Sequence, residues 1–143
     1  MKVTVVFDSK QLARNLTKIQ RAIPAMIDRA LLQTAQEGSN VIQDRTKTGV
    51  GYEGGAFKGY SAKYALFRRK KGRGTSPVDL NFYGTMMGAM ASAKVKKGVA
   101  KIYFTRGTEA KKAAFNDKTR PFFGFNRSEQ SRLQKFFVSR IKV

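Results

Sequence analysis

The first part of the chain repeats its apolar residues with the spacing of an α-helix. Four of them recur every three or four positions, at Leu12, Leu16, Ile19 and Ile23. Asp8 or Ser9 can cap the helix that this spacing predicts. Pro24 suits the first turn of a following helix, because the N–H that it lacks would have no partner there. We therefore expect a second, longer helix over 24–47, in which Gly38 permits close packing against a neighbouring element.

The remaining pattern predicts a small sheet. Apolar and β-branched residues at 3–7 indicate a short strand near the N-terminus. Residues 93–97 and 101–104 are separated by Gly98 and predict a β-hairpin. The apolar residues within 120–125 indicate a further strand or a turn.

Short helices complete the pattern. One is expected within 82–90, where two glycines weaken it, and another at 109–115. Ser128 can cap a final helix with Glu129 in its first turn. The apolar face of that helix carries Leu133, Phe136, Phe137 and Ile141. We expect its two phenylalanines to lie in the core.

The segment 48–77, called the arm below, differs from the rest of the chain. It contains seven glycines, the basic run 68–71 and interleaved aromatic residues, without a long period. A structureless loop of about 30 residues is uncommon in a compact domain and is usually functional or disordered. We therefore expect an extended arm or long hairpin that is ordered mainly by partners.

Together these elements predict an α+β fold in a single domain spanning 1–143. A long N-terminal helix would pack on a small antiparallel sheet, with the Gly-rich basic arm and a C-terminal helix completing the domain. A chain of 143 residues suits one domain. Compact packing at this length would give a diameter of about 35–40 Å.

The charge of the chain limits its partners. It has 29 Lys and Arg against 9 Asp and Glu, a formal net charge of +20, and the cations are spread along its whole length. A polyanion such as nucleic acid is the first partner to expect. The apolar run at the N-terminus is too short for a signal peptide, and no segment is long enough to span a membrane. We expect a soluble protein made in a cytoplasm, without a membrane partner.

Several kinds of chemistry find little support. The chain has no Cys and no His, which excludes disulfides and cysteine zinc sites and removes the commonest general base. The nine acids are scattered, so a metal-dependent nuclease would need ligands from distant parts of the chain. The sequence GVGYEG at 49–54 matches a dinucleotide-binding pattern, but it follows a predicted helix instead of a strand. A flexible loop is the better interpretation.

The arm carries the candidate binding residues. They are the aromatic residues Phe57, Tyr60 and Tyr64 and the cations Arg68, Arg69, Lys70 and Lys71. Rings beside cations could stack the bases of a single strand. They could equally fill a subunit interface while the cations contact a phosphate backbone, which the glycines and the general basicity favour.

The order of several motifs resembles the bacteriophage virion-morphogenesis or tail-completion family. The arm GGAFKGYSAKYALFRRKKGRG follows IQDRTKTG, and VDLNFYGTMMGAM (78–90, called the step) resembles the family's Leu–Thr–Gly–Met step, with Tyr83 in place of Thr. EAKKAAFND then leads to RPFFGFNRSEQSRL, which resembles the family's Arg-Pro-Phe-Phe-Gly box before a terminal helix. The resemblance covers about 43–133.

The resemblance implies a structural virion protein at the head–tail junction or the top of the tail. It implies a homo-oligomeric ring, with six copies expected, that joins neck, connector and tail proteins of the virion after assembly in the host cytoplasm. It implies no enzyme, catalytic residue, cofactor or metal. The box, Arg120, Pro121, Phe122, Phe123 and Gly124, is expected to contact neighbouring subunits together with the arm.

The charge restricts how such a ring could meet packaged DNA. Six copies would carry about +120, whereas duplex DNA through a ring of about 35–40 Å presents only about 20–25 phosphates. Much of the positive surface would therefore face acidic proteins or counterions. The competing hypothesis is a basic protein that binds nucleic acid non-specifically outside a virion. No helix-turn-helix, zinc finger or recognisable RNA-binding pattern supports it.

Overall fold

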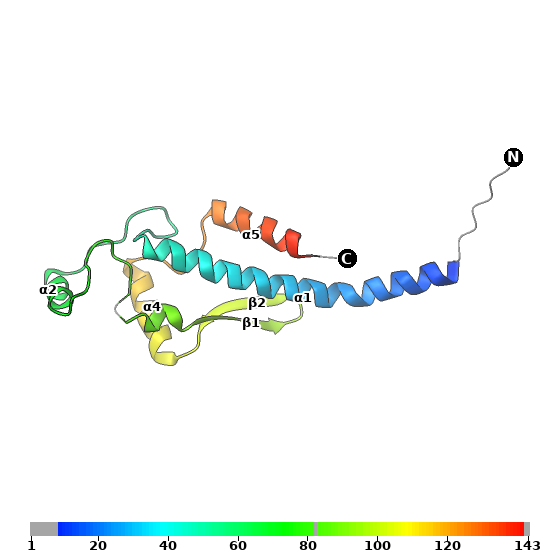
Figure 1. Cartoon of the computed structure of the whole chain (residues 1–143), viewed down its shortest axis with the longest axis horizontal. Coiled ribbons are helices and arrows are strands. Elements are labelled where there is room, and N and C mark those ends of the chain that lie inside the picture. The colour runs from blue at the N-terminus through cyan, green and yellow to red at the C-terminus, as the bar shows by residue number, and fades with distance from the viewer. Residues whose placement is uncertain (1–8, 82, 142–143) are drawn as a thin grey trace.

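The computed structural model describes residues 9–81 and 83–141. The strand expected at 3–7 lies outside the described residues. The fold is α+β, as predicted, with a long N-terminal helix, a two-stranded antiparallel sheet and a C-terminal helix. Figure 1 shows an elongated molecule in which one helix runs through most of the length and the other elements gather around its C-terminal part.

Helix α1 spans Ser9–Lys47 without interruption, with Pro24 inside it. The prediction of two helices, the second beginning at Pro24, is therefore wrong. Proline leaves the carbonyl of Gln20 without its helical partner, but Gln20 is exposed and water can solvate that group. The apolar spacing also continues in phase across Pro24. A helix of 39 residues is about 58 Å long, so the compact diameter expected from chain length is exceeded.

The predicted hairpin is confirmed. Strand β1, Met90–Lys96, pairs with β2, Val99–Phe104, in a register that sets Ser92 opposite Ile102. The hairpin lies along one side of α1 (Figure 1), and Asp28 of α1 fastens its turn. One Asp28 oxygen accepts from the Gly98 N–H at 2.8 Å and the other lies 2.6 Å from Lys94 Nζ. These bonds, with that of Lys94 the strongest, lower the pKa of Asp28.

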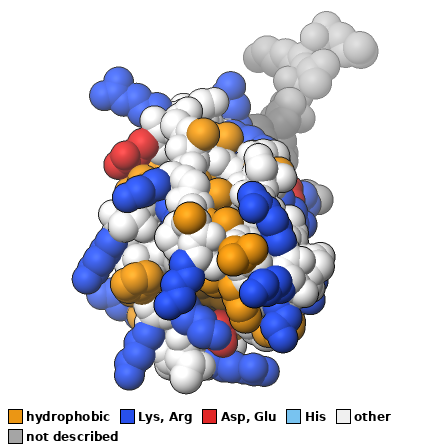
Figure 2. Space-filling model, turned by 90° about the vertical axis from the view of Figure 1, so that its left-hand side faces the viewer, with side chains coloured by type: hydrophobic (Ala, Val, Ile, Leu, Met, Phe, Trp, Pro, Cys, Tyr) orange, Lys and Arg blue, Asp and Glu red, His pale blue; other side chains and the backbone are white. Residues whose placement is uncertain are grey.

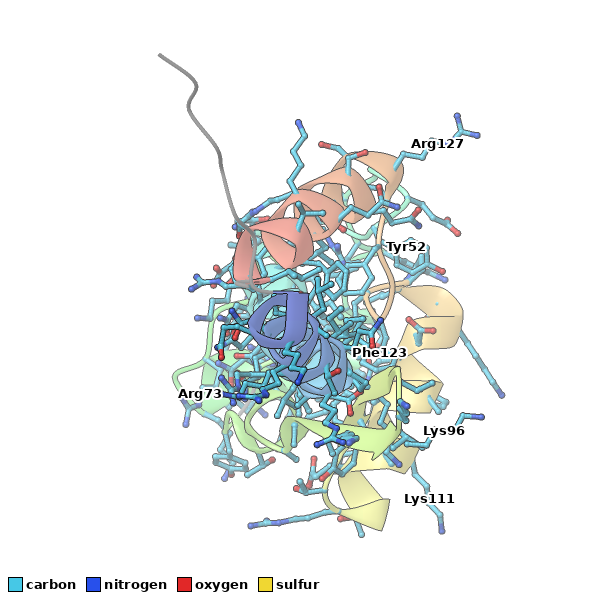
Figure 3. The ribbon with its side chains drawn as sticks, turned by 90° about the vertical axis from the view of Figure 1, so that its right-hand side faces the viewer. Tyr52, Arg73, Lys96, Lys111, Phe123 and Arg127 are labelled. Carbon is cyan, nitrogen blue, oxygen red and sulfur yellow. The ribbon has the colours of Figure 1, made fainter. Side chains whose placement is uncertain are left out.

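Helix α5, Arg127–Arg140, lies along another side of α1 (Figure 3). Its N-cap is Asn126. The prediction that Ser128 caps this helix is therefore wrong. The Asn126 side chain accepts from the Glu129 N–H, and Glu129 accepts from the Asn126 N–H, which completes a capping box. Leu133 is buried, but the two phenylalanines that follow are only half-buried, so the expectation that both lie in the core is wrong.

Three further helices are shorter. Helix α3, Thr85–Gly88, lies within the step, and α4, Gly107–Thr119, is longer at both ends than expected. The arm contains α2, Ala62–Lys70, where the sequence predicted an extended arm or a long hairpin and no helix. Ser61 caps α2 by accepting from the Tyr64 N–H at 3.3 Å. Residues 120–125 form bends and irregular backbone and no strand.

The core lies where α1 meets the hairpin, the step and the box. Its buried members are Ile42, Phe57, Val78, Met86, Met90, Ala113 and Phe122. Gly38 allows the close approach predicted for it, because a Cβ there would lie 2.9 Å from the ring of Phe125 and 3.2 Å from Ile102. The core thus anchors the start of the arm through Phe57 and leaves α2 at one end of the molecule (Figure 1).

Candidate partner-binding cleft

The arm leaves α1 through a tight loop. Gly49 takes a positive φ of 77° directly after the helix, and a short bridge joins Val50 to Ala56. The first glycines of GVGYEG therefore end a helix and close a tight loop, at a place where the sequence had predicted only a flexible loop. Phe57 then enters the core, so its side chain presents no surface to a partner.

Arg68 is the one cation of the run 68–71 that is buried. Its Nε donates to the Gly74 carbonyl at 2.7 Å and its Nη2 to the Asn81 carbonyl at 2.9 Å, with Asp79 3.8 Å away. These bonds fasten α2 to the loop that follows it and to the first residues of the step. Arg68 thus acts as a structural residue. The expectation that it contacts a partner is wrong, because its guanidinium is bonded within the fold.

The other three cations of the run, Arg69, Lys70 and Lys71, are exposed at the C-terminal end of α2. Their position suits the partial negative charge of a helix C-terminus. Tyr64 and Phe67 are partly exposed on the same helix, with ring centroids 6.0 Å apart and planes inclined by 28°. Figure 2 views this end of the molecule and shows Lys and Arg around apolar patches, with little acidic surface.

Tyr60 joins the arm to the box. The guanidinium of Arg68 lies 4.7 Å from the centre of its ring, and that of Arg120 lies 5.3 Å from it. Arg120 also donates to the carbonyls of Lys58 and Gly59, at 2.7 and 3.0 Å. The structure therefore brings together Tyr60 and Arg120, two residues singled out in separate motifs, with Tyr64 edge-on to Tyr60 at 5.1 Å.

The environment of Tyr60 further disfavours ionisation of its phenol, which is neutral near pH 7 even at its ordinary pKa. Burial raises the pKa of Tyr60, because a buried phenolate would lose its hydration, and the positive charge of Arg68 opposes this only in part. Near neutral pH the ring therefore offers an uncharged aromatic face to the two guanidiniums. Cation–π contacts of this kind contribute about 0.5–2 kcal/mol each.

Beside Tyr60 lies an open cleft of about 780 Å³. Its aromatic lining comprises Tyr60, Tyr64, Tyr83 and Phe115. Its cationic lining comprises Lys58, Lys112 and Arg120, together with the buried Arg68. Among the described residues, no Asp or Glu lines it. Tyr83 and Phe115 are 73% and 74% exposed, which is unusual for side chains of their size. The cleft therefore suits a partner that combines negative charge with apolar or aromatic groups.

The rest of the box has a structural role. Asp117 accepts from the N–H groups of Phe122 and Phe123 at 3.0 Å, and Arg45 donates to the carbonyls of Phe122 and Gly124. Phe122 is completely buried, which corrects its assignment as a partner contact.

The neighbouring box residues are half-buried and pack against the rest of the fold. The Pro121 carbonyl accepts from the Tyr52 N–H at 3.1 Å, and Gly124 lies against the Tyr52 ring, where a Cβ would come within 2.7 Å of it. Phe123 packs against Phe104, with ring centroids 5.3 Å apart. Of the box, Arg120 alone lines the cleft.

Sequence reasoning missed the contribution of the step and of α4 to this cleft. Tyr83 was noted only as a departure from a motif, and Phe115 was assigned to a short helix without a role. The available signal was Phe115 itself, a large apolar residue in a helix of small and charged residues.

The structure was also searched for metal sites and membrane-spanning helices, and the chain was compared with known proteins. Among the described residues, no group of three or more His, Cys, Asp or Glu is placed to hold a metal ion. None of the described helices has the length and apolar character needed to cross a bilayer. Comparisons with protein-family models, curated proteins and solved structures found no match. The family resemblance of the motifs therefore stays a prediction.

Proposed function

We propose that this chain is a structural subunit of a tailed-bacteriophage virion that acts in a ring at the head–tail junction. One observation carries the proposal. The segments that resemble the tail-completion family, namely the arm, the step, α4 and the first residue of the box, all contribute side chains to the same open cleft. Segments that are far apart in sequence thus meet at one surface suited to a protein partner.

The charge distribution suggests how the subunit would dock. The cleft presents cations and aromatic rings, so an acidic segment with an apolar or aromatic side chain would fill it. Positive potential over the surrounding surface would accelerate encounter with acidic connector or tail proteins. The length of α1 changes the expected contact with DNA. If α1 lined the channel along its axis, about 58 Å of duplex would present about 34 phosphates, still a minority of the charge on six copies.

The test is deletion of the gene from the phage or prophage that carries it. We expect filled heads and separate or defective tails, and recovery of infectious particles when the purified protein is added to that lysate. A variant with Phe115→Ala and Tyr83→Ala should fold normally but fail to restore joining. The matched control is Val138→Ala on α5, an exposed apolar residue outside the cleft, which should restore joining. Normal infectious particles from the deletion strain would contradict the proposal.

A second function is favoured by one observation, the exposed pair Tyr64 and Phe67 beside the cations at the end of α2. Such a surface could hold single-stranded nucleic acid by stacking and phosphate contacts. Under this hypothesis, Tyr64→Ala and Phe67→Ala would weaken binding to single strands much more than binding to duplex. Equal losses of affinity for single strands and for duplex would contradict base stacking and indicate only non-specific binding to phosphates.

A further inference from the structure

The N-terminal part of α1 extends away from the rest of the molecule (Figure 1). Every side chain from 13 to 23 is exposed, including three large apolar ones. Leu16 is 51% exposed, and Ile19 and Ile23 are each 39% exposed. An isolated helix of this length is marginally stable in water, and exposure of an apolar stripe to water does not stabilise it. The stripe therefore indicates a contact made in an assembly.

The spacing of the stripe identifies the kind of contact. Leu16, Ile19, Ile23 and Met26 follow one another at steps of three, four and three residues, and we call them the seam. This alternation is that of the two core positions of a heptad, which face a partner helix. It also gives a narrow stripe, whereas a helix that packs on a broad surface carries a wider apolar face. Ala30, four residues after Met26, continues this spacing but is completely buried in the described structure, so the seam ends before it.

The residues beside the seam carry no charge. At about 100° per residue, its immediate flanks in the exposed part are Asn15, Gln20 and Ala22. The cations Arg14, Lys18 and Arg21 lie on the opposite side of the helix. Figure 3, which looks along α1 from its N-terminal end, shows α5 on one side of it and the hairpin on another. Charge is thus kept away from the exposed part of the seam, and the first cation at a flanking position is Arg29, beyond Met26.

This placement decides between three occupants. A membrane-surface helix would have a wide apolar face with Lys and Arg along its borders. An acidic partner helix would be recognised by cations at the flanking positions. Neutral flanks favour neither, but they allow two copies of the same helix to meet, because the like charges of both copies then point outward.

We propose that the N-terminal part of α1 pairs with the same part of a second copy of this chain through the seam. Two identical surfaces that meet about a two-fold axis form a closed contact, so the product is a dimer. The contact is separate from the ring of the proposed function, whose contacts would be made by other surfaces. The dimer would be the state of the free protein, and its formation does not depend on the virion.

The first experiment measures association of the full chain by sedimentation equilibrium in about 0.3 M salt, which screens the net charge to a few ångströms. We expect a monomer–dimer equilibrium. Leu16→Lys and Ile19→Lys should each raise the dissociation constant about a hundredfold or more, because a symmetric pair loses two buried side chains. Thr17→Lys adds the same charge on the outer face and should leave the constant within about threefold of the original. A wild-type monomer at all concentrations, or equal effects of the three variants, would overturn the proposal.

The second experiment uses the absence of native cysteine. After mild oxidation, Leu16→Cys and Ile19→Cys should give disulfide-linked dimers. If the helices are parallel, each variant should crosslink with itself. If they are antiparallel, crosslinking should need a mixture of the two variants. Thr17→Cys should not, and crosslinking there at the same rate would contradict the seam. Head–tail joining by Leu16→Lys separates the two proposals. Loss of dimers with normal joining supports the seam and leaves the ring intact, whereas unchanged dimers refute the seam whatever happens to joining.

Discussion

Loss of the Arg45 side chain should destabilise the fold strongly. Its side chain is 10% exposed, and its Nη1 lies 2.6 Å from an oxygen of Glu129, which is 14% exposed. Its Nη2 donates to the carbonyls of Phe122 and Gly124. Arg45→Ala would leave the buried Glu129 carboxylate without its cation and with the Asn126 N–H as its remaining donor, and would remove the Arg45 donor from the carbonyls of Phe122 and Gly124. Removing one partner of a buried ion pair costs about 3–5 kcal/mol.

The matched control is the other ion pair between the same two helices. Arg132 lies 3.0 Å from Glu37, but its side chain is 66% exposed, so Arg132→Ala should cost at most about 1 kcal/mol. For a chain of this size, Arg45→Ala should lower Tm by roughly 10–20 °C and Arg132→Ala by less than about 4 °C. Thermal and urea unfolding followed by circular dichroism at one pH and salt concentration would measure both. Equal losses for the two variants would refute the argument from burial.

Three further results are expected. Replacing Arg69, Lys70 and Lys71 by Ala should reduce the slope of log DNA affinity against log salt by up to about 3, if each contacts one phosphate, and weaken all sequences alike; an unchanged slope in a salt titration would place these cations away from DNA. Arg68→Ala should instead lower the free energy of unfolding, because Arg68 is buried and fastens α2; equal Tm values for it and Arg69→Ala would contradict this. The lowered pKa of Asp28 means that its stabilising effect is present above its ordinary value near 3.8 and is lost as pH falls through the folded value. The stability difference between the wild type and Asp28→Asn should therefore shrink in acid unfolding series below about pH 4, and a difference that grows there would contradict the assignment.

The sequence predicted the elements whose pattern is local. The hairpin around Gly98, the long helix with its Gly38 contact and the terminal helix with Glu129 in its first turn were all visible in the spacing of apolar, glycine and capping residues. Pro24 misled, because local propensity favours it at a helix start while the continuous apolar pattern and water around the Gln20 carbonyl allow it inside.

The candidate site was only partly predictable. Arg68 belongs to a run of four cations that looks uniformly solvated, and its burial depends on carbonyls at Gly74 and Asn81 that only the folded loop supplies. The meeting of Tyr60 with Arg120 joins positions 60 residues apart, which no local pattern encodes. For the same reason, Phe57 and Phe122 were assigned to a surface, although the fold places both in the core.

The central claim, a ring subunit at the head–tail junction, is tested most directly by electron microscopy of the assembled particle at a resolution that traces helices. The account predicts a ring of this chain at the junction or the top of the tail, with the cleft beside Tyr60 filled by a segment of a neighbouring protein. A particle that lacks this chain, or that carries it elsewhere with the cleft open to solvent, would contradict the account.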